Sequence, residues 1–286
     1  MKRTIAAVIL VLFACNWAFA ESSVWKAQKG NAVIYLGGTC HVLRQSDFPL
    51  PPEFAKAYGA SQVVVFEADP GELQDPAMQK KALARSIYPD GSTIDKHLSP
   101  DTYAQLAAYC QANNIPLAAL RQFKVSVAMV SLTFLELMKL GVDQKGVDYF
   151  FYELAKKEGK KVEALESADE QLEALVTIAD GNEDEFVSYA IRDLGTLKER
   201  FAELAGAWRT GDTVKLNELL VSQLRTEDPK EYQKLVVDRN RKWLPAILGY
   251  HASRQTRLVL VGAAHLVGPD GILEALKKKG YRVEKL

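Results

Sequence analysis

Residues 34–43 read IYLGGTCHVL, and residues 258–267 read LVLVGAAHLV. In each stretch a strand-like apolar run leads directly into the pattern Gly-x-x-His. The four residues that define the two copies are Gly38 and His41, and Gly262 and His265. Short apolar runs of this kind are typical of strands buried on both faces of a parallel sheet. The sequence therefore predicts that the two copies are equivalent strand ends in one sheet.

Each copy continues in the same way, with a proline-containing turn, a helix-like stretch and another strand-like stretch. These are residues 51–61 and 62–69 after the first copy, and residues 269–280 and 281–286 after the second. The repeated unit is therefore strand, Gly-x-x-His, helix, strand. We expect an α/β (α+β) fold whose central sheet is built from these two units, with a large helical insertion at about residues 75–250 between them.

Capping signals mark helices inside the insertion. Three helix starts are indicated, at Ser99-Pro100, at Ser167 with Glu170 three residues later, and at Asp228-Pro229. The first and third place proline in the first turn, and the second is a capping box. The stretch 160–166, KKVEALE, is expected to add a strand in the middle of the chain.

The carboxyl ends of parallel strands lie at one edge of a sheet, where open α/β folds bind ligands. His41 and His265 would meet there. Glu67 joins them, because it ends the apolar run 63–66 and a buried carboxylate needs a partner. Two imidazoles and one carboxylate leave a coordination position open, which favours a catalytic metal. The alternatives for Glu67 are a helix cap, a solvated carboxylate, or a general base beside the metal.

Arg239 falls on the apolar face of the helix that begins at Asp228-Pro229, seven residues after Tyr232. A buried guanidinium must be paired. One interpretation is an ion pair with a carboxylate or a helix neighbour. The other places Arg239 at the site, directed at a metal-bound carboxylate or a developing oxyanion. The two interpretations are compatible.

The first 20 residues have the features of a secretory signal peptide. Lys2 and Arg3 precede an apolar stretch at residues 5–14, and a small-x-small cleavage site ends at Ala20. We therefore expect a periplasmic or secreted protein. A lipoprotein attached through Cys15 is the less favoured alternative.

The remaining chain offers little for nucleic acid or membrane. Removing Lys2 and Arg3 from the 36 basic residues leaves 34, against 36 acidic ones. A nucleic-acid-binding protein would show a basic patch, and no later run has the roughly 20 apolar residues of a membrane span. We expect neither partner.

Two cysteines remain after cleavage, Cys40 and Cys110, and two are not a disulfide scaffold. Cys110 has the spacing of a core residue. Cys40 precedes His41, but Ala264 occupies the matching place in the second copy, which argues against a required metal ligand. Whether the two cysteines pair is left open.

Several segments, taken in order, resemble the TraB/GumN family, to which the Tiki metalloproteases are related. They are IYLGGTCHVL, VVVFEAD, KGVDYFF with Gly146 and Asp148, LESADEQL with Glu166 and Gln171, DRNRKW with Arg239 and Asn240, and the closing stretch 261–286. The resemblance implies a single domain over residues 21–286. It also implies a site of His41, Glu67 and His265, a peptidase activity, and manganese or cobalt, with zinc possible.

Two functions follow as hypotheses. The first is a metal-dependent hydrolase, most simply a peptidase acting on a peptide or protein, in which Arg239 and Asn240 steady the oxyanion. The second is a non-catalytic cell-envelope protein that binds haem, a metal or a partner in the same pocket. It is favoured by the lack of a His-Glu-x-x-His or Gly-x-Ser-x-Gly pattern.

Overall fold

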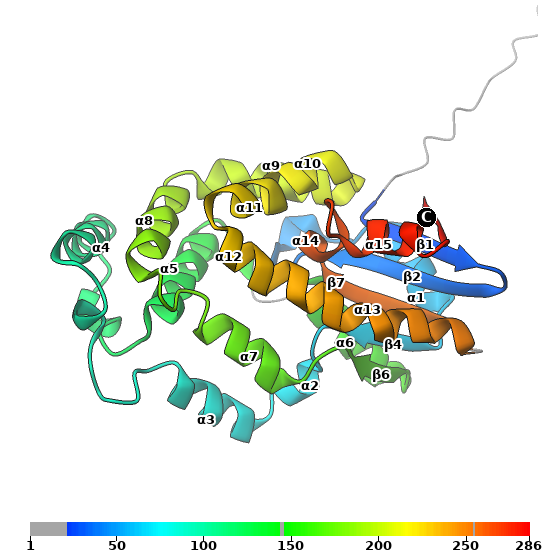
Figure 1. Ribbon diagram of the computed structural model, residues 1–286, viewed down its shortest axis with the longest axis horizontal. Helices are drawn as coiled ribbons and strands as arrows, with labels where there is room; N and C mark the ends of the chain where they lie inside the picture. The colour runs from blue at the N-terminus through cyan, green and yellow to red at the C-terminus, as the bar shows by residue number, and fades with distance from the viewer. Residues whose placement is uncertain (1–21, 144–145, 254) are drawn as a thin grey trace, which may run out of the picture.

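The computed structural model describes residues 22–143, 146–253 and 255–286. The expected signal segment 1–20, with Cys15, lies outside the described residues. A six-stranded sheet with the order β6-β4-β7-β2-β1-β8 forms one end of the molecule (Figure 1). Its strands are β1 (Val24–Lys29), β2 (Ala32–Thr39), β4 (Val63–Phe66), β6 (Lys161–Ala164), β7 (Arg257–Gly262) and β8 (Arg282–Lys285). The short strands β3 (Leu43–Arg44) and β5 (Val142–Asp143) form a separate pair.

The central strands carry the apolar runs. Every residue of β4 and of β7 is buried. Strands β6, β4, β7 and β2 are parallel, whereas β1 is antiparallel to both β2 and β8. Helices such as α1 (Pro52–Gly59), α13 (Arg239–Gly249) and α15 (Ile272–Lys278) pack beside the sheet. The α/β class and the strand expected at residues 160–166 are thus confirmed.

The two repeated units interlock at the centre of the sheet. Strand β7 of the second unit lies between β2 and β4 of the first. Thr39, at the end of β2, is in register with Gly262, at the end of β7, and Phe66, at the end of β4, is in register with Leu260. The two Gly-x-x-His strands are therefore direct neighbours, and the strand leading to Glu67 lies on the other side of β7.

Helices form most of the remaining chain, and many of them extend to the left of the sheet in Figure 1. Besides those named they are α2 (Pro70–Leu73), α3 (Pro76–Arg85), α4 (Pro100–Ala112), α5 (Val125–Lys139), α6 (Val147–Glu158), α7 (Ala168–Val176), α8 (Glu183–Leu194), α9 (Leu197–Thr210), α10 (Thr213–Asn217), α11 (Gln223–Glu227), α12 (Pro229–Tyr232) and α14 (Ala263–Leu266). A second apolar core, distinct from that around the sheet, lies among α4, α5 and α8.

The three expected N-capping residues, Ser99, Ser167 and Asp228, form capping hydrogen bonds. Ser99 accepts a hydrogen bond from the backbone N–H of Thr102, and Ser167 and Glu170 form the capping box. Asp228 caps α12 by accepting from the N–H of Glu231 at 3.0 Å. These contacts satisfy N–H groups that a helix leaves unpaired at its start.

Helix α12 runs on into α13 through a π-helical segment, Gln233–Asp238, which ends next to Arg239. Such segments often occur at functional sites, because the extra residue re-aims the side chains that follow. The continuous helix extends from the helical region to the sheet (Figure 1). It is the element that carries Arg239 to the edge of the sheet.

Trp208 is buried within this chain, where its indole N–H donates to the carbonyl of Gly38 at 2.7 Å. Cys110 is a core residue as expected, and Cys40 and Cys110 are both free thiols. In the part of the chain that the structure describes, no helix is both long and apolar enough to cross a membrane.

Candidate functional site

Three side chains predicted from the sequence meet at the carboxyl edge of the sheet. His41 follows β2, Glu67 follows β4, and His265 lies in α14, directly after β7. Gly262 lies between them: a methyl group there would be 3.1 Å from His41 Nε2, 3.3 Å from Glu67 Oε1 and 3.7 Å from His265 Cδ2. The lack of a side chain at this position leaves room for the three to approach one another.

Glu67 is buried and its carboxylate is held on both oxygens. Oε1 accepts from the backbone N–H of Gly262 at 2.6 Å and lies 3.8 Å from Nε2 of His265. Oε2 accepts from Arg239 at 2.6 Å and from Gln171 at 3.3 Å. Burial by itself would raise the pKa of Glu67, but the neighbouring positive groups and the Gly262 N–H lower it to about 2. The carboxylate is therefore ionised.

His265 is fixed from behind by Asn240. Both amide hydrogens of Asn240 go to backbone carbonyls, those of His265 at 3.1 Å and Asp270 at 2.9 Å. Its Oδ1 must then accept from Nδ1 of His265, 2.9 Å away. This leaves the lone pair of Nε2 directed into the site, 3.1 Å from Nη1 of Arg239. Burial lowers the pKa of His265 to about 4, so the ring is neutral.

His41 is held in the same manner by Asp148. Its Nδ1 lies 2.9 Å from Oδ2 of Asp148, in the first turn of α6. Asp148 raises the pKa of His41 to about 9, and the burial of the ring nitrogens opposes this increase. Because the side chain as a whole is 61% exposed, water screens part of the attraction between His41 and Asp148. The Gly146 backbone packs against the carbonyl groups of Cys40 and His41, and a side chain there would collide with them. These contacts fix the position of His41 relative to helix α6.

Arg239 links two buried glutamates. Its Nε and Nη2 donate to the two oxygens of Glu166 at 3.1 and 2.6 Å, and Nη2 also donates to Glu67. Trp243, one helical turn further, donates to Glu166 at 3.2 Å and stacks under the guanidinium at 4.6 Å. The expected ion pair of Arg239 with a carboxylate is thus present, and one of its two partners is Glu67 of the candidate site.

The structure brings together His41, Glu67, His265 and Arg239, the four residues that the sequence predicts for this site. For Asn240 the expected contact with an oxyanion needs correcting, since both of its amide hydrogens are already donated to carbonyls and its contacts instead orient His265. Three partners were not assigned a role from the sequence: Asp148, Glu166 and Gln171. They lie in segments that carry the family resemblance, but a carboxylate near a helix start looks like any capping residue.

The sequence pattern that defines the TraB/PrgY/gumN family matches residues 23–285. The chain belongs to this family. It is similar to a protein named Metalloprotease TIKI homolog from Amphimedon queenslandica, with 24% identity over 336 aligned positions. The alignment covers 95% of this chain and 62% of that protein, so this chain spans about three fifths of the relative's length. No solved structure matches the chain.

The donor set of this TraB/PrgY/gumN protein fits a divalent ion in its chemistry. Both histidines have Nδ1 hydrogen-bonded to a polar partner, the arrangement that prepares Nε2 for a metal. Two ligands of a tetrahedral ion stand about 3.3 Å apart, compared with 3.8 Å between His265 Nε2 and Glu67 Oε1. Within the described ranges, however, no three acidic, histidine or cysteine side chains are already spaced as metal ligands. Arg239 is the group that contacts His265 Nε2 instead.

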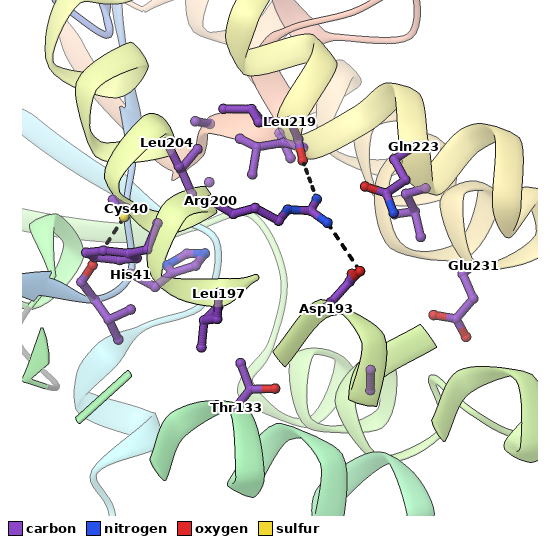
Figure 2. Close-up of a pocket in the computed structure, with 18 of the residues that line it drawn as sticks. Cys40, His41, Thr133, Asp193, Leu197, Arg200, Leu204, Leu219, Gln223 and Glu231 are labelled. Carbon is purple, nitrogen blue, oxygen red and sulfur yellow. Dashed lines mark hydrogen bonds and ion pairs between the residues drawn. The ribbon is translucent and has the colours of Figure 1, made fainter. Parts of the chain in front are cut away.

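A cavity of about 650 Å³ opens from this site into the helical region (Figure 2). His41, Glu67, Arg239 and His265 line one part of it, and side chains from α5, α8, α9 and α11 line the rest. Pockets of this size accommodate ligands rather than single ions. The site is therefore open to a molecule considerably larger than water.

Proposed function

We propose that this TraB/PrgY/gumN protein is a metal-dependent hydrolase that cleaves peptide bonds. The observation that carries the proposal is the matched anchoring of two histidines, with Asp148 behind His41 and Asn240 behind His265. The Nε2 atoms of both rings lie beside the ionised carboxylate of Glu67, and that of His265 also contacts Arg239. The name of the relative from Amphimedon queenslandica, a metalloprotease homologue, supports the reaction class.

His41, Glu67 and His265 would hold the ion. When bound, such an ion supplies an activated water and polarises the substrate carbonyl. Manganese or cobalt is our favoured choice, with zinc as the alternative. Glu67 has a second candidate role as the general base, because its Oε1 borders the same space.

Arg239 keeps Glu67 ionised and brings N–H donors to the edge of the site, where a developing oxyanion would be stabilised. Glu166 and Trp243 hold the guanidinium in place. Asn240 acts through His265 and is a positioning residue.

Export remains part of the proposal and rests on the sequence alone. Cleavage of residues 1–20 would place the protein in the periplasm or outside the cell, and attachment through Cys15 is the alternative. Mass spectrometry of the protein isolated from its host would distinguish an N-terminus at Glu21 from a lipidated Cys15.

The first experiment measures bound metal by elemental mass spectrometry after loading with manganese, cobalt and zinc in turn. We expect near-stoichiometric metal in the wild-type protein and loss of it in the His41→Ala, His265→Ala double variant. Peptide cleavage should disappear in the same variant. Unchanged metal content and unchanged cleavage in the double variant would overturn the proposal.

Glu67→Gln separates the two roles of this carboxylate. Retained metal with lost cleavage assigns the general base, whereas lost metal assigns a ligand. A protein that binds metal or haem in this cavity but cleaves no peptide would instead support the non-catalytic alternative. For haem, the readout is a Soret band that the His41→Ala variant loses.

A further inference from the structure

The cavity beside the site has apolar walls. Leu197 and Phe201 of α9, Leu220 of the π-helical segment Glu218–Ser222, and Leu224 of α11 all line it. Figure 2 shows Leu197 and Leu204 on the side of His41, and Glu231 at the opposite side of the same space. A ligand that starts at the Gly-x-x-His site and extends into the cavity therefore meets apolar surface first.

Charged side chains that line the cavity are mostly paired with one another. Arg192 donates to Glu227 at 2.6 Å and to Asp193 at 3.3 Å. Arg200 crosses the cavity in Figure 2 and lies 3.2 Å from Asp193. These four residues bring two positive and two negative charges, and they neutralise one another.

Asp228 and Glu231 remain, and they differ in what they contact. The carboxylate of Asp228 accepts from Asn182 at 2.9 Å and from the backbone N–H of Glu231. The carboxyl group of Glu231 has no hydrogen bond or ion pair within the described part of the chain, although only 7% of the residue is exposed. Its oxygens remain accessible from the cavity, so a ligand there can reach them, and an acid in a largely buried residue without a partner is costly to keep.

The electrostatic surroundings of Glu231 agree with this reading. Burial and the nearby Asp228 together raise the pKa of Glu231 to about 8, against the opposing effect of Lys234. Apart from the Gly-x-x-His site, where Glu67 and Arg239 pair with each other, the other charged side chains facing the cavity are the paired set described above, Arg192, Asp193, Arg200 and Glu227. A positively charged group that enters the cavity would form an ion pair with Glu231, which has none with the described residues.

We propose that this cavity binds a basic side chain of the peptide substrate, a lysine or an arginine, and that Glu231 is the residue that recognises its charged end. The inference rests on the proposed peptidase function and adds a substrate class to it. The apolar walls suit the methylene stem of such a side chain, and the buried carboxylate suits its ammonium or guanidinium group. An acidic side chain would instead meet Asp228 and Glu231 without compensation.

The first test compares peptides that carry lysine or norleucine at one position, moved step by step across the cleaved bond. Norleucine keeps the apolar stem and lacks the charge. At one position we expect lysine to give a kcat/KM about tenfold higher than norleucine, the scale of one charge-assisted hydrogen bond. Glu231→Gln should remove this ratio at that position and at no other.

Glu227→Gln is the matched control, because Glu227 lines the same cavity but already contacts Arg192. It should keep the lysine-to-norleucine ratio. An equal ratio in the wild-type protein and in Glu231→Gln, or a preference for norleucine at every position, would overturn the assignment.

A second test does not depend on cleavage or on the folding of a variant. Pentan-1-amine and pentan-1-ol share the stem and differ in charge. Their binding to the wild-type protein is measured by ligand-observed NMR at pH 9, where both the Glu231 carboxylate and the amine are charged. We expect the amine to bind about tenfold more tightly, with the preference weakening as salt is added. Equal binding would refute the role of Glu231 even if peptides are cleaved. Amine binding without any peptide cleavage would refute the peptidase function and leave the cation site standing.

Discussion

Nη1 of Arg239 lies 3.1 Å from Nε2 of His265, the ring nitrogen that a metal would need. The contact is possible because Asn240 holds the hydrogen of His265 on Nδ1. A cation in this site and the guanidinium therefore compete for the same lone pair and for the charge of Glu67. Substitution of Arg239 can therefore separate its effects on stability, on metal binding and on catalysis.

Arg239→Ala should destabilise the metal-free protein. Removing one partner of a buried ion pair costs about 3–5 kcal/mol, because Glu67 and Glu166 lose their compensating charge. Divalent metal should then raise the melting temperature of the variant more than that of the wild-type protein, since an ion that binds the folded state stabilises it. Thermal unfolding with and without manganese measures both effects.

Arg241→Ala is the control for that experiment. Arg241 lies two residues further on the same helix, and its side chain is 72% exposed, with Asp238 3.8 Å away. It should behave as wild type. An equal metal-induced shift in the Arg239→Ala variant and in the wild-type protein would contradict the competition.

Gly262→Ala should block the metal site without unfolding the protein. Gly262 has φ −49° and ψ 137°, which an alanine adopts without strain. Its methyl group would enter the space between His41 Nε2 and Glu67 Oε1. We expect metal affinity to fall more than about tenfold while the melting temperature changes by only a few degrees. Calorimetric metal titration beside thermal unfolding measures the two quantities.

Gly249→Ala provides the comparison, because a methyl group at Gly249 would have no atom within 4 Å. Its metal affinity should match that of the wild-type protein. Wild-type affinity in the Gly262→Ala variant would mean that the ion binds elsewhere.

Asn240→Ala should weaken metal binding by about 10–100-fold, because His265 would lose the acceptor that fixes its ring and tautomer. Competition with a chelating dye gives the affinity. Asn182→Ala removes a similar amide that contacts Asp228 instead, and should leave the metal affinity unchanged. If the two variants bound metal equally well, Asn240 would have no role in positioning His265.

Glu231→Gln should stabilise the protein at alkaline pH even as it removes the proposed recognition of a cation. The folded pKa of about 8 lies above the ordinary glutamate value of 4.5. The folded state therefore binds more protons than the unfolded state between these values, and stability falls as the pH rises from 4.5 to 8. Glutamine removes this loss. The variant should gain up to a few kcal/mol over wild type at pH 8.5 and little at pH 4.5.

Chemical denaturation at pH 4.5, 6.5 and 8.5 checks this dependence. Glu227→Gln, in which the lost carboxylate had an arginine partner, should show no such gain. A stability difference between wild type and Glu231→Gln that stays constant with pH would show that the Glu231 carboxyl is not held in its neutral form.

Much of the site was predictable because it sits on regular structure. Buried apolar runs end at His41, Glu67 and His265, and in a parallel sheet such ends must meet at one edge. The helix starts at Ser99, Ser167 and Asp228 were predictable for a similar reason, since a cap acts on N–H groups only two or three residues away.

Other features depend on contacts between residues far apart in the chain. The Asp148 contact with His41 spans 107 residues, and that of Glu166 with Arg239 spans 73. Periodicity shows that Arg239 faces inward but not which carboxylate it meets. Likewise, Glu231 has the sequence position of the third residue of an ordinary capped helix. Only the tertiary structure shows that it is buried beside a cavity that α8, α9 and α11 also line.

The sequence by itself determined the α/β class, the repeated unit and the three side chains at the edge of the sheet, because local hydrophobic patterns specify strands and strand ends. Only the tertiary structure decided that Asn240 orients His265, that Arg239 bridges Glu67 and Glu166, and that Glu231 has no partner among the residues that the structure describes. Those outcomes depend on which distant groups come within hydrogen-bonding distance, a property of packing that no local pattern contains.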